Sequence, residues 1–206
     1  MAVVKKWRVY IESTVLADWL HFESAHKSHR ALLSRQVKDS YRLVNYLLEG
    51  KSKIAQPFTS YWAIYEALGA FKRTNIELWL VADGIPTSFY NDLKESAKYK
   101  LKPSQLPEIK KLIHVLTSGD KSRKGLRPLA EEADIDNGIS LILEGNLEAP
   151  DSFHVGIALS YGCDMLVTRD HHYFRKGVKA SQRGIEILRP SALVWRLQRH
   201  GEVLPS

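Results

Sequence analysis

Apolar and polar residues alternate over Trp7–Ile11, which is the period of a β-strand, and small polar residues follow. The residues from Val15 to Phe22 suit the start of a helix. Between residues 37 and 48 the apolar positions recur at helical spacing, and Gly50 marks a natural helix end. Residues 53–58 form a second short candidate strand. The first quarter of the chain therefore predicts a strand, two helical segments and another strand.

The helix expected after the second strand carries Glu66 and has Thr59 or Ser60 as its N-cap. From about residue 72 to about residue 133 the periodicity weakens, although residues 76–82 remain compatible with a helix. Several turn signals that contain Gly and Pro also occur there. This stretch is difficult to assign to regular elements from the sequence.

The C-terminal part alternates helices and strands more clearly. Helices are expected at 137–143, 150–161 and 191–198, and short buried strands at 165–167 and 185–188. Strands that alternate with helices indicate a parallel sheet with helices on both faces. We therefore expect an α/β protein.

Composition narrows the class further. The chain has 206 residues, of which 44% are hydrophobic and 26% charged, and these values suit one globular domain over residues 1–206. Cys163 is the only cysteine, which excludes an intramolecular disulfide and a zinc site made of cysteines. The sequence contains no signal-peptide pattern and no apolar run long enough for a membrane span. We expect a cytoplasmic protein that does not associate with membranes.

The net charge of +7 comes from one part of the chain. Residues 94–127 contain ten Lys and Arg and three Asp and Glu, so the rest of the chain is neutral overall. This stretch lies within residues 72–135, which we interpret as a largely helical or loop insertion. It either contacts a nucleic-acid backbone or is a solvated segment, and the sequence is consistent with both.

Four carboxylates occupy positions that suggest a common site. Glu12 and Asp170 follow candidate strands, Glu66 lies one or two turns into a helix, and Asp151 lies in the first turn of another. In an open parallel sheet the crevice lies at the carboxyl ends of the strands. Four acids there would repel one another unless cations lay between them, and hard oxygen ligands favour Mg²⁺ or Mn²⁺. Taken singly, each acid could instead have a structural role, because an acid after a strand is often a helix cap and Asp151 could simply favour a helix N-terminus.

Four segments resemble motifs of the PIN-domain nucleases. Ile11–Leu16 resembles the opening of that family, and Tyr61–Leu68 resembles its helix with a Glu. Asp151–Leu159 resembles its Asp-x-x-His helix. Gly162–Phe174 is the most specific match, with a glycine, an aspartate, a strand, Thr-x-Asp and an aromatic run.

The resemblance covers about residues 6–71 and 137–195. It implies a three-layer α/β/α fold with a mainly parallel sheet, and cleavage of RNA that depends on Mg²⁺ or Mn²⁺. By position, Glu12, Glu66, Asp151 and Asp170 would be the catalytic and metal-binding acids. The family also suggests a homodimer, and an antitoxin protein as a partner of its toxin members.

Further residues take supporting roles in this interpretation. Ser13 and Thr168 would orient carboxylates through their hydroxyls, and His154 would be either a substrate contact or a satisfied inner histidine. The candidates for RNA contact are Arg169, His171, His172, Lys176, Lys98, Lys100, Lys110 and Lys111.

Other interpretations are weaker. Gly50–Ser52 resembles the end of a P-loop, but the motif needs a glycine at position 45, which is Asn. A phosphatase or receiver-like protein would need a phosphorylatable acid after the first strand, and Glu12 suits that poorly. The sequence departs from the PIN pattern at Glu12, where Asp is usual, and at Thr14, where Asn is usual. These departures motivate an alternative, a PIN-fold protein that binds RNA with little catalysis.

Overall fold

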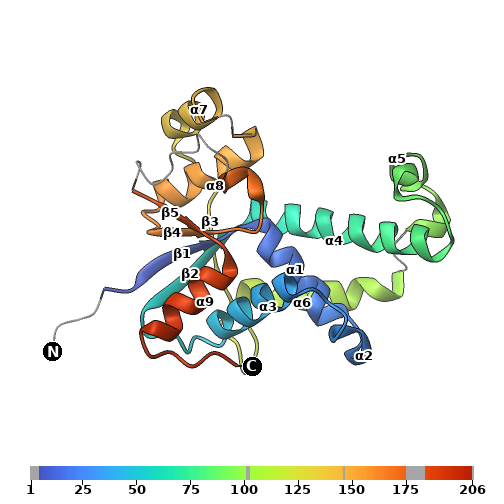
Figure 1. The fold of residues 1–206 in the computed structure, drawn as a ribbon, viewed down its shortest axis with the longest axis horizontal. Helices are drawn as coiled ribbons and strands as arrows, with labels where there is room; N and C mark the ends of the chain where they lie inside the picture. Colours follow the sequence, from blue (N-terminus) through green and yellow to red (C-terminus); the bar gives the residue numbers. More distant parts are fainter. Residues whose placement is uncertain (1–4, 101–102, 146, 175–183, 206) are drawn as a thin grey trace.

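A single five-stranded sheet forms the centre of the molecule, and all of its strands are parallel (Figure 1). The computed structural model describes residues 5–100, 103–145, 147–174 and 184–205. The strands are β1 (Trp7–Ile11), β2 (Ala55–Ser60), β3 (Arg127–Leu129), β4 (Met165–Val167) and β5 (Glu186–Leu188). They lie in the order β3-β2-β1-β4-β5. The expected parallel sheet is confirmed.

Helices cover both faces of the sheet. The helices are α1 (Ser13–Ser24), α2 (Lys27–Arg30), α3 (Arg35–Leu48), α4 (Tyr61–Ala82), α5 (Tyr90–Leu93), α6 (Leu106–Ser118), α7 (Ile135–Leu143), α8 (Ala149–Ser160) and α9 (Pro190–Arg199). Short 3-10 turns are η1 (Thr87–Phe89), η2 (Ala97–Tyr99), η3 (Pro103–Gln105) and η4 (His171–Phe174). One core joins the sheet to α1, α3, α4, α6 and α9, and the other joins it to α7 and α8. The expected three-layer α/β/α architecture is thus confirmed.

The central strands are buried on both faces. In β1, Val9 and Ile11 belong to the core on the α1 side, whereas Tyr10 belongs to the core beneath α8. In β4, Leu166 packs on the α8 side, between two residues that pack on the other. Because successive side chains of a strand point to opposite faces, apolar residues at every position are expected for a covered parallel sheet.

The strand order creates a switch in direction beside β1. From β1 the chain moves outward to β2 and β3, then returns across the sheet to β4 and continues to β5. The connections that leave β1 and β4 therefore diverge, and the crevice between their carboxyl ends is a topological switch point. Open α/β sheets bind ligands at such points.

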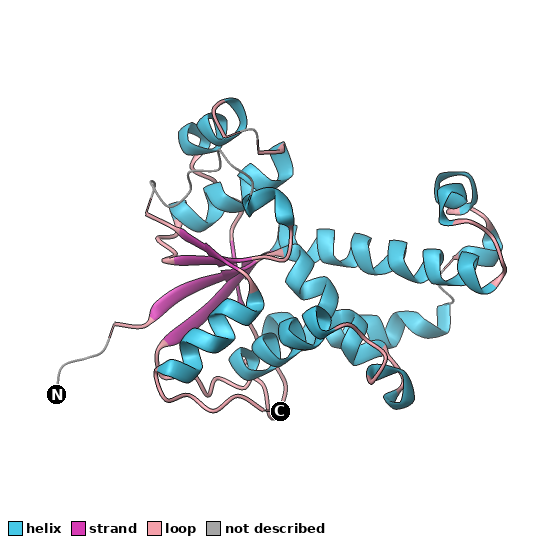
Figure 2. Cartoon of the chain, viewed as in Figure 1, coloured by secondary structure: helices cyan, strands magenta, loops and turns pink. Residues whose placement is uncertain are grey.

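Helix α4 runs from the sheet into an arm (Figure 2). It begins at the end of β2, and its outer half extends away from the sheet to the short helix α5, from which the chain returns through α6. A small separate cluster of Ile76, Leu80 and Tyr99 packs the far part of the arm. No described helix, the 22-residue α4 included, is long and apolar enough to cross a membrane.

The stretch expected to be an insertion is more continuous with the core than the sequence indicated. Helix α4 passes through residue 72 without a break, and β3 at Arg127–Leu129 is an edge strand paired with β2. Gly125 and Pro128 are among the Gly and Pro turn signals of this stretch, so the sequence indicates a turn and not a strand here. Pro128 is tolerated in β3 because an edge strand leaves one side of its backbone unpaired.

Candidate acid and histidine site

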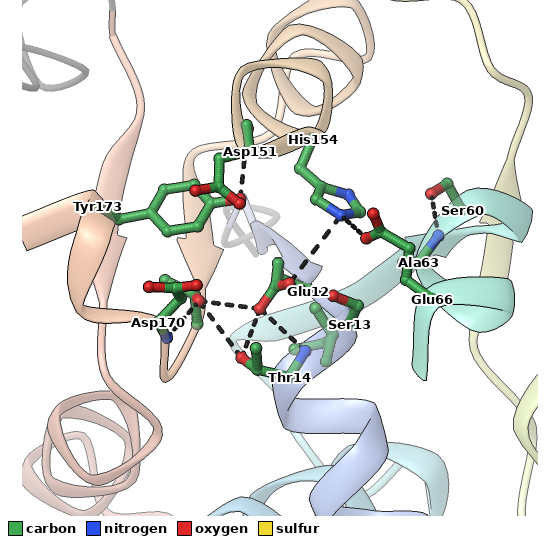
Figure 3. Close-up of polar contacts among 12 residues, drawn as sticks. Glu12, Ser13, Thr14, Ser60, Ala63, Glu66, Asp151, His154, Asp170 and Tyr173 are labelled. Atoms are coloured by element: carbon green, nitrogen blue, oxygen red, sulfur yellow. Dashed lines mark hydrogen bonds and ion pairs between the residues drawn. The ribbon is translucent and has the colours of Figure 1, made fainter. Parts of the chain in front are cut away.

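Glu12 lies at the centre of the site, directly after β1, and its side chain is buried (Figure 3). Its Oε2 caps α1 by accepting hydrogen bonds from the Thr14 N–H at 3.0 Å and the Thr14 hydroxyl at 2.5 Å. Oε2 also accepts from Thr168 Oγ1 at 2.8 Å, and Oε1 accepts from the Ser13 hydroxyl. A carboxylate offers about four lone-pair positions. Three of the four donors converge on Oε2, whereas Oε1 accepts only from Ser13, so Oε1 is the atom of Glu12 that keeps room for a further ligand.

A buried histidine links α8 to α4. The Nε2 atom of His154 lies 2.5 Å from Glu66 Oε2 and 3.9 Å from Glu12 Oε1. Its Nδ1 atom lies 2.9 Å from the Tyr10 hydroxyl, which in turn lies 2.7 Å from Ser60 Oγ. Ser60 also caps α4 by accepting a hydrogen bond from a backbone N–H of its first turn. His154 is thereby held between the central strand and the helix that carries Glu66.

One arrangement of protons satisfies this whole chain. Ser60 donates to the Tyr10 oxygen, Tyr10 donates to Nδ1 of His154, and Nε2–H donates to Glu66. Burial, the largest cause, raises the pKa of Tyr10 far above its ordinary range, so its hydroxyl keeps its proton as a donor. In this arrangement His154 is neutral and Glu66 is an acceptor.

Asp151 and Asp170 lie near each other on one side of Glu12, and His154 and Glu66 lie on the other side (Figure 3). The Nδ1 atom of His172 lies 3.8 Å from Asp151 Oδ2 and 3.7 Å from Asp170 Oδ1. The backbone N–H of His172 donates to Asp170 Oδ1 at 2.8 Å, and the N–H of Asp170 donates to Thr168 Oγ1 at 2.9 Å. Tyr173 donates its hydroxyl to the backbone oxygen of Asp151 at 3.2 Å. The turn after β4 therefore holds Asp170 beside the first turn of α8.

Asp151 carries the clearest electrostatic sign of a cation site. Burial first, and then the nearby charges of Asp170 and Glu12, raise its pKa from 3.8 to about 6. Its Oδ2 atom is buried without a hydrogen-bond partner among the described residues. A buried carboxylate oxygen that lacks a donor and faces like charges is stabilised by a cation.

The four predicted acids thus reach one end of the sheet, but they divide into two groups. Ligand atoms of Glu12, Glu66 and His154 lie within 4.8 Å of one another, and so do those of Asp170, His171 and His172. Asp151 adjoins the second group through His172. Carboxylate oxygens and the unpartnered Asp151 Oδ2 fit Mg²⁺ or Mn²⁺ on the Asp151–Asp170 side. On the other side, Glu66 is already bound to His154.

The side chain of Arg169, a predicted RNA contact, pairs with an acid of helix α1. Its Nη1 atom lies 2.5 Å from Asp18 Oδ1 on α1, and its backbone N–H donates to Thr14 Oγ1 at 3.0 Å. Asp18 is buried, and burial, as the largest cause, raises its pKa even though Arg169 acts in the opposite direction. The arginine therefore ties the loop that carries Thr168 and Asp170 to helix α1.

The predicted lysine contacts lie on the arm and not at the acids. Lys98 pairs with Asp83 at 2.8 Å, and Lys100 is exposed nearby. Lys110 and Lys111 are exposed on α6, the helix that returns along the arm (Figure 1). Lys176 lies outside the described residues. Any contact of these lysines with RNA would therefore involve a strand that extends along the arm.

Three aromatic residues beside Glu66 were not singled out from the sequence. Tyr61, Trp62 and Tyr65, in the first turns of α4, are 51%, 40% and 70% exposed. The Trp62 ring stands edge-on to Phe153 of α8, with ring centroids 5.9 Å apart. The available signal was their spacing, because Tyr61 and Tyr65 are one helical turn apart and share a face.

Comparison with protein-family models, curated proteins and solved structures found no match to the chain.

Proposed function

We propose that the protein is a metal-dependent ribonuclease that hydrolyses RNA phosphodiester bonds at the acid site. The observation that carries the proposal is the state of Asp151, a partly buried carboxylate whose pKa is raised to about 6 beside Asp170 and Glu12. Active sites are where such perturbed groups gather. The position of these acids at the topological switch point of the sheet supports the same proposal.

In this proposal Asp151 and Asp170 hold the metal. A bound Mg²⁺ or Mn²⁺ would neutralise negative charge on the phosphodiester and would lower the pKa of a water molecule. Thr168 orients the site from both sides, because it donates to Glu12 and accepts from the backbone of Asp170. Glu12 fixes the start of α1 and keeps negative charge near the metal position. His154 orients Glu66 at the rim.

The exposed aromatic residues favour RNA as the substrate over a small phosphoester. Tyr61, Trp62 and Tyr65 lie on the same helix as Glu66, and Trp62 contacts Phe153 of α8, the helix that carries Asp151 and His154. Stacking of a base on an aromatic side chain contributes about 1–3 kcal/mol. An extended strand with its scissile phosphate at the acids would bring neighbouring bases to this helix face. The homodimer and the antitoxin partner that the family resemblance suggests remain predictions.

The direct test is cleavage of RNA by the purified protein. With Mn²⁺ or Mg²⁺ we expect cleavage of single-stranded RNA, and with EDTA we expect none, because the acids alone cannot neutralise a phosphodiester. An Asp170→Asn variant purified in parallel controls for contaminating nucleases, and it should lose the activity while keeping its fold by circular dichroism. Wild-type protein that cleaves no RNA with either metal, or an equally active Asp170→Asn variant, would contradict the proposal.

Metal affinity should depend on pH through Asp151. Its pKa of about 6 means that the carboxyl is mostly protonated below pH 6, and a metal must then displace the proton. We expect the affinity for Mn²⁺ to be level above pH 7 and to fall by up to about tenfold per pH unit below pH 6. Calorimetric titration across this range measures it. An affinity that is equal at pH 5 and pH 7.5 would show that Asp151 is not a ligand.

One observation favours a second function, an RNA-binding protein of this fold with little catalysis. Four donors already surround Glu12, and Glu66 is bound to His154, so two of the four acids are engaged within the chain. The titration with Mn²⁺ discriminates between the two functions. RNA binding without measurable metal binding would support this second function.

A further inference from the structure

A second concave site lies at the opposite end of the sheet from the acids. It is a cavity of about 380 Å³ beside the amino-terminal half of β2. Strand β3 first pairs with β2 at Phe58↔Arg127, so Ala55–Pro57 have no strand partner on that side. The sheet opens there, and loops from α3 and α6 close the remaining walls. The lining residues are Lys6, Leu47, Gly50, Ser52, Ala55, Gln56, Pro57, Lys124, Gly125 and Arg127.

The charges around this cavity have one sign. Lys6, Lys124 and Arg127 line it, and they come from two separate segments of the chain, Lys6 from the residues before β1 and the other two from the loop and the start of β3. Its described lining contains no Asp or Glu, and none of the three cations forms an ion pair with a described residue. Lys6 Nζ donates to the backbone oxygen of Ser52 at 3.0 Å. Three cations that converge without a carboxylate repel one another, and a bound anion relieves this.

Lys124 is held in place at the cavity. Its backbone N–H donates to Leu48 O, at the end of α3, at 2.6 Å. Its side chain crosses directly over Gly50, where a Cβ atom would lie only 2.6 Å from Lys124 Cδ. Gly50 also has a φ of 65°, a conformation that other residues rarely adopt. The glycine at the end of α3 thus lets the lysine approach, and a held cation loses less entropy on binding.

The loop before β3 is also closely packed. A Cβ atom at Gly125 would lie 2.7 Å from the backbone nitrogen of Gly119. Asp120 accepts hydrogen bonds from the N–H groups of Ser122 and Arg123, at 2.8 and 2.9 Å. This loop belongs to the basic stretch that carries the net charge of the chain. Two of its cations, Lys124 and Arg127, therefore face a defined cavity.

A buried acid, Glu202, is bonded to Ser52 of this cavity but is not part of the cavity lining. Glu202 accepts hydrogen bonds from the Ser52 hydroxyl and from the backbone N–H groups of Lys53 and Ile54. It lines a neighbouring cavity with His200 and not this one. These donors hold Glu202, and among the described residues it forms no ion pair with Lys6, Lys124 or Arg127.

We propose that this cavity binds a phosphate group, carried by a nucleotide or by an RNA strand. Arg127 and the two lysines supply charge-assisted donors for phosphate oxygens. The apolar floor of Leu47 and Pro57 gives room for an attached nucleoside, because ligand cavities of about 300–1,000 Å³ hold molecules of that size. The site is separate from the acid site and binds its ligand whether or not the acids are catalytic.

Calorimetric titration in EDTA tests the proposal, since EDTA keeps metal-mediated phosphate binding at the acids out of the measurement. The probes are inorganic phosphate, AMP and a short oligouridylate. The variants are Lys124→Gln and Arg127→Gln, and Lys121→Gln in the same loop is a control with the same loss of charge. We expect each variant at the cavity to weaken binding about tenfold, and the control to bind as wild type does.

Each outcome has a defined meaning. Binding of phosphate and AMP that is lost in the cavity variants supports a site for a free nucleotide. Binding of the oligouridylate alone, with the same losses, supports a site for the RNA backbone. Lys6→Gln, on a separate segment, replaces a loop variant that fails to fold. Absence of binding by wild-type protein with every probe would overturn the proposal, as would cavity variants that bind as tightly as Lys121→Gln.

Discussion

An Asp151→Asn variant is expected to be more stable than the wild-type protein at neutral pH and inactive in RNA cleavage. Burial and the charges of Asp170 and Glu12 raise the pKa of Asp151 from 3.8 to about 6, so the charged form is unfavourable in the folded protein. The difference in pKa corresponds to about 3 kcal/mol, and solvent screening reduces it to about 1–2 kcal/mol. An amide of the same shape does not carry this cost.

The stability advantage of Asp151→Asn over the wild-type protein should depend on pH. Because the folded pKa lies above the unfolded one, the wild-type protein gains stability as the pH falls from about 6 toward 4. The Asn variant lacks this gain, so its advantage should be present at pH 7 and absent near pH 4. The same substitution removes a proposed metal ligand, and loss of even an outer partner of a metal site typically costs about 10–100-fold. We therefore expect cleavage to fall by more than about a hundredfold.

Unfolding without metal at pH 4 and pH 7, together with cleavage assays in Mn²⁺, measures both effects. Asp120→Asn is the matched control, because the backbone N–H of Ser122, as the largest cause, lowers the pKa of Asp120. That variant should become less stable at pH 7 and should cleave normally. If Asp151→Asn were destabilised at pH 7, repulsion within the acid cluster would not be the dominant interaction of Asp151.

A Glu12→Ala variant is expected to lose about 3–5 kcal/mol of stability, from the lost N-cap and the buried donors left without an acceptor. The donors are the hydroxyls of Ser13, Thr14 and Thr168 and the N–H of Thr14. Removal of its charge also relieves Asp151, but Glu12 is only the third cause of the raised pKa there. The loss of hydrogen bonds should therefore dominate.

Chemical denaturation of Glu12→Ala and of Glu12→Gln separates the contribution of the hydrogen-bond acceptor to stability from that of the negative charge. The Gln side chain keeps an accepting oxygen at the position of Oε2, where three of the four donors converge, so it should lose less stability than Ala. A Glu12→Ala protein with the wild-type free energy of unfolding would mean that the hydroxyl groups find water instead, and that Glu12 has no structural role.

The strands β1, β2, β4 and β5, and the end of the sheet that carries the acids, could be predicted from the sequence. Apolar runs such as Met165–Val167 are too short for helices, and turn residues bound them, so their type was clear. Parallel strands place their carboxyl ends at the same edge of the sheet, so the sequence alone predicts that Glu12 and Asp170 lie close together. These inferences depend on local periodicity and on topology alone.

The partners of the acids could not be predicted in the same way. His154 binds Glu66 from 88 positions away, and Arg169 binds Asp18 from 151 positions away. No local pattern specifies such pairs, because they follow from how α8 and α1 pack on the sheet. Residue type alone suggested that Arg169 could contact a phosphate, and that contact stays a prediction. The pairing of its guanidinium with a buried aspartate on α1 could not be read from the sequence.

Strand β3 was missed for a related reason. Its three residues include Pro128, and a proline normally indicates a turn or an edge. Only its pairing with β2 makes the segment a strand.

The hydrogen bond between Thr168 and Glu12 joins residues that are 156 positions apart, and this has a consequence for the order of folding. Ribosomes deliver the chain from its N-terminus at about 5–20 residues per second. Strand β1 and helix α1 emerge early, but β4 and Asp170 arrive only after most of the chain has been made. The acid cluster therefore cannot be complete until Asp170 has been made, although β5 and α9 follow it in the chain. A fold whose central strand pairs with a late one is also expected to fold slowly, because distant contacts must form before the sheet closes.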